Sequence, residues 1–137
     1  MEKLPAILLV DDDDTTNFLN EHLLSRLGVA QQVRVVTDGQ QALELLTQPA
    51  PYAPSLLLLD VKMPVMDGIE FLEAYRQLPA SQQAATVVVV LTTSMAAADL
   101  ARINELPIAG LVSKPLSRDK VDTLLRLHFN RELPAGE

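Results

Sequence analysis

LLLLDVKMPVMDG, the stretch Leu56–Gly68, decides the fold class of this chain. It begins with four leucines in a row, without a polar residue between them. A strand with one solvated face alternates apolar and polar residues, whereas a strand covered on both faces is apolar throughout. The run ends at Asp60, and Pro64 and Gly68 mark a loop after it. The stretch therefore predicts a strand inside an α/β sandwich, with a carboxylate at its C-terminal end.

Four further apolar runs occur along the chain, and amphipathic segments separate them. The predicted strands are Ile7–Val10, Val33–Val36, Leu56–Leu59, Val87–Leu91 and Leu111–Val112. Helical spacing predicts five helices. The first carries Leu19–Leu27 and ends at Gly28, and the second carries Ala42–Leu46 and ends before Pro49. The third starts near Gly68, the fourth runs from about Ala97 to Leu106, and the fifth starts after Ser117.

This alternation of strands and helices favours right-handed crossovers, a parallel five-stranded sheet and helices on both of its faces. We therefore predict one α/β domain over residues 1–132, with a Pro-rich loop at Pro49–Pro54. Residues 133–137 are predicted to form a short C-terminal tail.

Composition excludes several classes of function. The net charge of −7 and the pI near 4.7 argue against a nucleic-acid-binding surface and against docking on an anionic membrane, because both need clustered Lys and Arg. The chain has no cysteine, which excludes disulfides and thiolate metal sites and fits a reducing cytoplasm. No segment approaches the roughly 20 apolar residues of a membrane span, and the N-terminus lacks a signal-peptide pattern. We expect a cytoplasmic protein.

The residues with chemical potential follow the predicted strands. Asp11–Asp14 come after the first strand, Asp60 after the third, Thr92 after the fourth and Lys114 after the fifth. Ligands bind at the carboxyl ends of strands in open α/β sheets, so these side chains converge if the first and third strands are neighbours. Two carboxylates about 4 Å apart repel by about 4 kcal/mol at a surface-like dielectric, and a hard cation such as Mg²⁺ relieves that repulsion. Together the groups suit a phosphoryl group in transfer, with Asp60 as the nucleophile.

Four blocks carry a resemblance to a known family. ILLVDDD at Ile7–Asp13, LLLLDVKMPVMDG at Leu56–Gly68, VVLTT at Val89–Thr93 and SKP at Ser113–Pro115 resemble, in order and spacing, the receiver domains of two-component response regulators. The resemblance covers roughly residues 5–129. It implies a flavodoxin-like, doubly wound (βα)5 fold, which is a three-layer sandwich whose parallel sheet has the strand order 2-1-3-4-5.

The resemblance also implies an acceptor and a metal site. Asp60 would accept a phosphoryl group from a histidine kinase or a His-phosphotransfer protein. Asp12, Asp60 and the backbone carbonyl of Lys62 would bind Mg²⁺ directly, and Asp11 would act through water. The chain would then be a signalling phosphoacceptor with Mg²⁺ as its cofactor, and not an enzyme beyond assisting its own phosphorylation and dephosphorylation.

Further roles follow from the same resemblance. Thr92 and Lys114 would bind the phosphoryl oxygens, and the Lys114–Pro115 peptide would be cis. The switch position on the fifth strand is usually aromatic in this family and is Leu111 here, so switching would use the packing of Leu111 or the loop after Thr92. The signal would leave by binding a separate output protein. The resemblance also allows a dimer through the face of the fourth predicted helix, the fifth strand and the fifth helix.

Two other functions compete. Asp11-x-Asp13-x-Thr15 after an apolar strand resembles the first motif of haloacid-dehalogenase phosphatases, with Asp11 as the nucleophile and Asp13 as the acid–base. The glycine-containing turn expected after that motif is missing, and Asp60 would have no role. The other alternative is an interaction module that keeps the fold without phosphorylation, and Leu111 is the residue that favours it.

Structural roles compete with chemical ones at several positions. Asp13 precedes the first predicted helix and Asp67 precedes the third, so a helix-capping role is the simpler prediction for both. His22 and His128 lie on predicted amphipathic helices. We expect them to be partly buried structural side chains rather than members of a phosphorelay.

Overall fold

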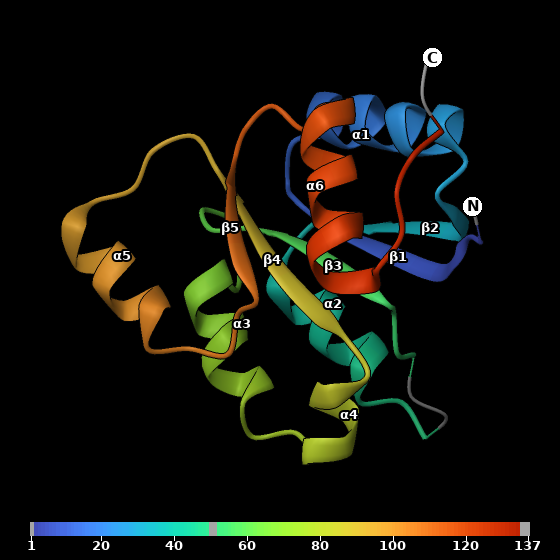
Figure 1. Ribbon diagram of the computed structural model, residues 1–137. Coiled ribbons are helices and arrows are strands. Elements are labelled where there is room, and N and C mark those ends of the chain that lie inside the picture. Colours follow the sequence, from blue (N-terminus) through green and yellow to red (C-terminus); the bar gives the residue numbers. More distant parts are fainter. Residues whose placement is uncertain (1, 50–51, 135–137) are drawn as a thin grey trace.

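A computed structural model describes residues 2–49 and 52–134 of the chain. The elements are β1 (Leu4–Val10), α1 (Asp14–Leu27), β2 (Ala30–Val36), α2 (Gly39–Leu46), β3 (Leu56–Asp60), α3 (Gly68–Tyr75), α4 (Ala80–Ala84), β4 (Val87–Thr92), α5 (Ala97–Asn104), β5 (Gly110–Ser113) and α6 (Arg118–Phe129). The strands pair in parallel in the order β2-β1-β3-β4-β5 (Figure 1). The predicted doubly wound fold and strand order are confirmed.

The sheet is the middle of three layers, because its side chains alternate between two cores. In β3, Leu57 and Leu59 pack in a core with residues of α2, α3 and α5. Leu56 and Leu58 pack in a second core with residues of α1 and α6. None of these four leucines is more than 3% exposed. Full burial of one such side chain contributes about 1.5–3 kcal/mol, so the continuous leucine run holds both helix layers on the sheet.

The strand register places three strand ends at one edge of the sheet. Val10, the last residue of β1, pairs with Leu59 of β3, and Asp60 pairs with Leu91 of β4. Residues that directly follow β1, β3 and β4 therefore emerge side by side. This is the edge at which the sequence predicted a site.

The helices around this edge begin with side-chain caps. Asp13, Asp38, Asp67 and Ser117 each accept a hydrogen bond from the backbone N–H three residues later. At α3 the cap is reciprocal, because the Glu70 side chain also accepts from the backbone N–H of Asp67. Caps of this kind contribute about 0.5–2 kcal/mol each. The capping roles predicted for Asp13 and Asp67 are confirmed.

One helix was not predicted. The short α4 follows Pro79 and has no buried residue, so it lacks the apolar periodicity by which the other helices were recognised. Glutamine side chains fix it instead. Gln82 donates to the carbonyl of Leu46, and Gln83 donates to that of Leu78.

The C-terminal segment packs further than the sequence indicated. Leu133, which was assigned to the tail, is 6% exposed in the core of α1 and α6. Its N–H donates to Asp122, and Arg118 donates to the carbonyl of Pro134. The predicted boundary at residue 132 remains a prediction. Residues 135–137 of the tail, and residues 50–51 of the predicted loop, lie outside the described residues.

None of the helices in the described part of the chain has both the length and the hydropathy of a membrane span.

The loop between β3 and α3 contains a strained residue. Val65 has a φ of 69°, and the N–H of Met66 donates to the carbonyl of Pro64 across it at 2.8 Å. A three-residue turn with positive φ is unfavourable for any residue with a Cβ and most of all for a β-branched one. The Val65 side chain is 74% exposed, so packing offsets little of this strain.

We expect Val65→Asn to raise the free energy of unfolding by about 1 kcal/mol, because Asn tolerates the left-handed region and few apolar contacts are lost. Urea unfolding followed by circular dichroism measures the change. Val65→Ala is the matched control, since its Cβ retains most of the strain, and it should stay within about 0.5 kcal/mol of the wild type. Equal stability of Val65→Asn and wild type would contradict the strain at this position.

Candidate functional site

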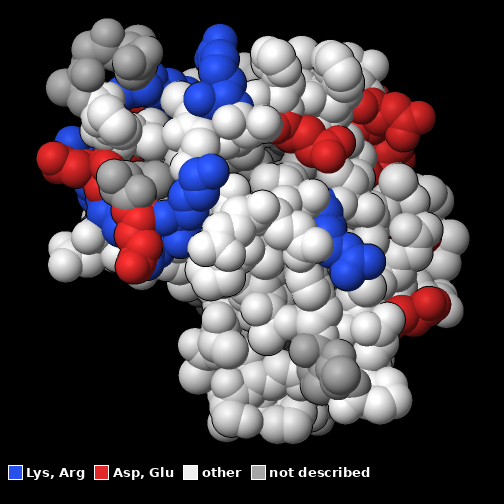
Figure 2. All heavy atoms as spheres, turned by 90° about the vertical axis from the view of Figure 1, so that its right-hand side faces the viewer, with Lys and Arg blue, Asp and Glu red and all other residues white. Residues whose placement is uncertain are grey.

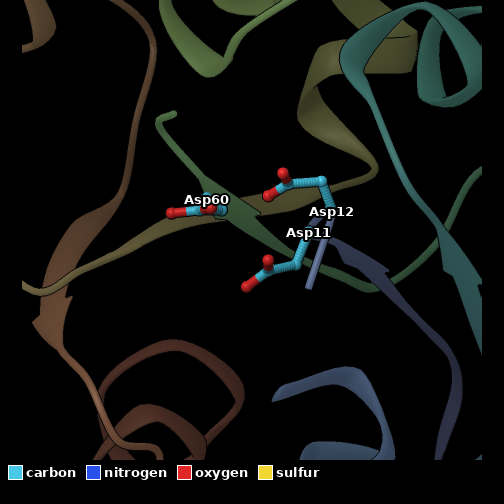
Figure 3. A group of neighbouring side chains, drawn as sticks. All are labelled: Asp11, Asp12 and Asp60. Atoms are coloured by element: carbon cyan, nitrogen blue, oxygen red, sulfur yellow. The ribbon is translucent and has the colours of Figure 1, made fainter. Parts of the chain in front are cut away.

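Three of the predicted carboxylates meet at the carboxyl edge of the sheet. Asp11 and Asp12 directly follow β1, and Asp60 ends β3, which is the neighbouring strand. Each offers an oxygen within 4.8 Å of the other two. Figure 3 shows the three side chains pointing into the same space. Parallel pairing of β1 with β3 therefore produces the convergence that the sequence predicted.

Lys114 supplies the positive charge of the cluster. Its Nζ lies 2.8 Å from Asp11 Oδ2 and 3.3 Å from Asp60 Oδ1, and its side chain is only 16% exposed. The residue follows β5, and its backbone N–H donates to the carbonyl of Thr92 at 2.9 Å. The Lys114–Pro115 peptide is cis, as predicted. One ammonium thus pairs with two of the three carboxylates.

The pKa values of both partners in the Asp60–Lys114 pair are shifted from their ordinary values. Burial raises the pKa of Asp60 above its ordinary value of 3.8, and the charge of Asp11 raises it further, whereas Lys114 and the N–H of Val61 oppose the shift. Burial alone would lower the pKa of Lys114, but its ion pairs with Asp11 and Asp60 outweigh burial and raise it. The cluster carries excess negative charge at neutral pH. Its donors are all carboxylate oxygens, a set that suits a hard divalent cation.

Asp11 is oriented from two sides. Its Oδ1 accepts the backbone N–H of Asp13 at 2.9 Å, and its carbonyl accepts the Nδ2 of Asn17 at 2.8 Å. Asn17 is 4% exposed and was missed by the sequence analysis. Helical spacing was the available signal, because Asn17, Asn20 and Leu24 form the buried face of α1. Asp13 itself accepts from Thr16 as the N-cap of α1, which is the capping role predicted for it.

The loop after β3 folds back onto Asp60, and Gly68 permits this. The N–H of Gly68 donates to the carbonyl of Val61 at 2.8 Å. A Cβ at Gly68 would lie 2.5 Å from the backbone oxygen of Asp60 and 2.9 Å from Cα of Val61, which is closer than any side chain tolerates. Lys62 lies in this loop, two residues after Asp60, and its side chain is exposed. The glycine of the Asp67–Gly68 pair thus allows the loop to pack against the end of β3.

Thr92 and Leu111 lie outside the carboxylate cluster. Thr92 ends β4, and its hydroxyl donates to the carbonyl of Ser94 at 3.3 Å. Leu111 lies on β5 opposite Val90 and is 40% exposed. The hydroxyl therefore holds the start of the loop that leads to α5.

The two histidines differ in burial. His128 is half-buried near the end of α6, as predicted. His22 is exposed, so the predicted partial burial is wrong for this residue. The helix α1 turns His22 toward solvent, where its ring lies 6.4 Å from that of Phe18.

Comparisons with known proteins agree on one family. A family model described as the response regulator receiver domain matches residues 7–126. The chain is 31% identical to a probable chemotaxis protein CheY of Rhizobium etli over 90% of this chain and 91% of that protein. A two-component response regulator from Cytophaga hutchinsonii has a TM-score of 0.82 at 28% identity, with 95% of this chain and all 100% of that chain covered.

A second similar structure contains an ion. The receiver domain of a sensor histidine kinase from Pseudomonas aeruginosa was crystallised with a magnesium ion coordinated in its active-site cleft. It has a TM-score of 0.78 at 22% identity, with 95% of this chain and 100% of that chain covered. At this identity the likeness extends to the fold.

We expect Asp60→Asn to raise the melting temperature of the protein in EDTA at pH 7 by a few degrees, since burial and Asp11 disfavour the ionised carboxylate. A folded-state pKa above the unfolded value means that wild-type stability falls as the pH rises from 3.8 through the folded pKa. The advantage of Asn should therefore be present at pH 7 and absent below that window. Mg²⁺ should reverse the order by binding the folded wild type more tightly. Scanning calorimetry of the wild type and Asp60→Asn, in EDTA and in Mg²⁺, at pH 7 and below that window, measures these differences.

Asp122→Asn is the matched control for this experiment. Asp122 lies on α6, and its pKa is lowered first by the backbone N–H of Leu133 and then by Arg126. Its carboxylate stabilises the fold above the unfolded pKa, so Asn should lower stability at pH 7 and leave the response to Mg²⁺ unchanged. A loss of stability in Asp60→Asn in EDTA would instead mean that the ion pair with Lys114 outweighs burial and repulsion.

Proposed function

This chain belongs to the response regulator receiver domain family, and from that premise we propose that Asp60 is its phosphoacceptor in a two-component phosphorelay. The main support is the position of Asp60, which ends β3 beside two further carboxylates within 4.8 Å and 3.3 Å from the ammonium of Lys114. We propose a histidine kinase or a His-phosphotransfer protein as the donor. Acid cluster, ammonium and hydroxyl together match the charge of a phosphoryl group in transfer.

In the proposed reaction a carboxylate oxygen of Asp60 attacks the phosphorus of a phosphohistidine on the donor. A P–O bond forms, the P–N bond breaks, and its electron pair stays on the imidazole nitrogen. Water later attacks the same phosphorus, so that orthophosphate leaves and the carboxylate is restored. Asp60 Oδ1 already accepts from Val61 and pairs with Lys114. We assign Oδ2 as the nucleophile, because no hydrogen bond occupies it within residues 2–49 and 52–134.

Lys114 and Thr92 are the proposed ligands of the phosphoryl oxygens. Phosphorylation replaces the single charge of the Asp60 carboxylate by about −1.5 to −2. Lys114 is already beside that carboxylate and would stay there. The Thr92 hydroxyl would exchange the Ser94 carbonyl, 3.3 Å away, for a phosphoryl oxygen.

We propose Mg²⁺ as the cation of the site. Asp12, Asp60 and the backbone carbonyl of Lys62 would bind it directly, with Asp11 acting through water. When bound, the ion neutralises charge that develops on the phosphoryl oxygens and relieves the repulsion among the carboxylates. The all-oxygen donor set and the excess negative charge support this assignment.

We further propose that another protein reads the phosphorylated state through the face of α5, β5 and α6. Apolar side chains are exposed on each of these elements, namely Leu100 on α5, Leu111 on β5 and Leu127 on α6. Release of the Ser94 carbonyl by Thr92 would free the loop that leads into α5. The same face is the proposed surface for a dimer, should the chain form one.

The first test is intact mass after incubation with Mg²⁺ and acetyl phosphate, for wild type and Asp60→Asn. We expect one base-labile phosphoryl group on the wild type, lost in EDTA, and none on Asp60→Asn.

The remaining outcomes separate the competing functions. An adduct that persists in Asp60→Asn would assign the nucleophile to Asp11, as in a haloacid-dehalogenase phosphatase. A folded wild type that binds Mg²⁺ and accepts no phosphoryl group from acetyl phosphate or from phosphohistidine donors would instead be an unphosphorylated interaction module. Either result would overturn the proposal.

The coupling between the site and the output face has its own test. In Thr92→Ala we expect phosphorylation of Asp60 to persist, while hydrogen exchange of residues 93–104 no longer changes on phosphorylation. Thr92→Ser keeps the hydroxyl and is the control, so its exchange should respond as the wild type does. An unchanged response in Thr92→Ala would exclude the threonine hydroxyl as the link.

A further inference from the structure

The side chain of Lys120 binds the two residues that flank Lys114. Lys120 lies in the first turn of α6, and its Nζ donates to the carbonyl of Ser113 at 2.7 Å, to the Ser113 hydroxyl at 3.2 Å and to the carbonyl of Pro115 at 2.9 Å. An ammonium group has three donors, and all three are used here. The turn that carries Lys114 is therefore fastened to α6 from both sides.

Helix stability does not explain a lysine at this position. Ser117 caps α6 by accepting from the backbone N–H of Lys120, which makes Lys120 the third helical residue. That position favours Glu or Gln in a capping box, and a cation near a helix N-terminus is opposed by the helix dipole. The contacts with Ser113 and Pro115 offset this cost, and they involve only the turn around Lys114.

The geometry of Lys114 depends on that turn. Its backbone N–H is held by the carbonyl of Thr92 at 2.9 Å, which fixes the β4 side. Lys120 holds the carbonyl of Ser113, which belongs to the peptide plane directly before the Lys114 Cα, and the carbonyl of Pro115, which lies one peptide beyond the plane that follows it. The side chain then spans to Asp11 at 2.8 Å and to Asp60 at 3.3 Å.

We propose that Lys120 is a positioning residue for phosphoryl transfer, which acts by holding the Ser113–Pro115 turn so that the Lys114 ammonium lies against Asp60. This inference rests on the proposed role of Asp60. Lys120 itself contacts no carboxylate of the cluster, and its effect passes through Lys114. Displacement of a catalytic group by about 1 Å can cost up to about a hundredfold in rate, so a loosened turn is enough to slow transfer.

The test compares Lys120→Met with Lys120→Arg in the full chain, with acetyl phosphate as donor and intact mass as the readout. We expect Lys120→Met to slow phosphorylation of Asp60 about tenfold, with the Mg²⁺ dissociation constant within about twofold of the wild type. Lys120→Arg retains charge and donors and should recover to within about threefold. Arg126→Met removes a charge from the same helix without touching the turn, and it should phosphorylate at the wild-type rate.

A second measurement distinguishes positioning from a general structural effect. If Lys120 acts through Lys114, the double variant Lys114→Met/Lys120→Met should be no slower than Lys114→Met alone. Three results would each overturn the inference. The rate losses of the two single variants could multiply in the double variant, Lys120→Met could lose Mg²⁺ affinity as much as it loses rate, or Lys120→Met could be phosphorylated at the wild-type rate. A wild type that accepts no phosphoryl group would overturn the proposed function itself, so the two failures are distinguishable.

Discussion

The ion pairs of Lys114 with Asp11 and Asp60, at 2.8 and 3.3 Å, are the interaction on which the rest of the site depends. They join residues that follow β1 and β5 to the last residue of β3, and thus close the carboxyl edge of the sheet. One ammonium cannot neutralise three carboxylates within 4.8 Å of one another. Burial raises the pKa of Asp60, and the charge of Asp11 raises it further. The site is therefore arranged to gain from a further cation, and then from a group that redistributes the negative charge.

The burial of the central strands on both faces, which identifies the fold, also determines where the carboxylates of the site lie. Each central strand is covered by helices on both faces, so an unpaired carboxylate within Leu56–Leu59 would be buried without solvation at a cost of several kcal/mol. The first position that tolerates a carboxylate is the one directly after the apolar run, which is Asp60. The same constraint places Asp11 after Val10 of β1. Because these strands are parallel neighbours, the two acids meet without any further device.

Local patterns predicted most of the fold and the acids of the site, whereas contacts between distant residues escaped them. Continuous apolar runs predicted the strands, and Asp13 and Asp67 were recognisable caps. The helix α4 was missed because glutamine side chains hold it in place of an apolar face. The packing of Leu133 and the positive φ of Val65 depend on tertiary contacts and on a turn that no composition rule predicts for valine.

The same distinction applies within the site. Asp60 and Lys114 were predicted because each follows an apolar run, but Lys120 lies on the surface of an amphipathic helix, where a lysine is unremarkable in sequence. Its importance arises from the short β5–α6 turn, which brings the first turn of α6 back over Ser113 and Pro115.

The family resemblance implies an aromatic residue at the position of Leu111, so under the proposed function this turn would carry a larger share of the coupling. A leucine that is 40% exposed has no hydroxyl and no ring plane with which to follow Thr92. Within the described residues, two sets of hydrogen bonds from side chains to backbone carbonyls lead from the site toward the proposed output face. One joins Thr92 to Ser94 and leads into α5, and the other joins Lys114 through Lys120 to α6. Both begin at a proposed ligand of the phosphoryl oxygens. Under the proposed function, charge added at Asp60 would therefore act on both helices of that face without an aromatic switch.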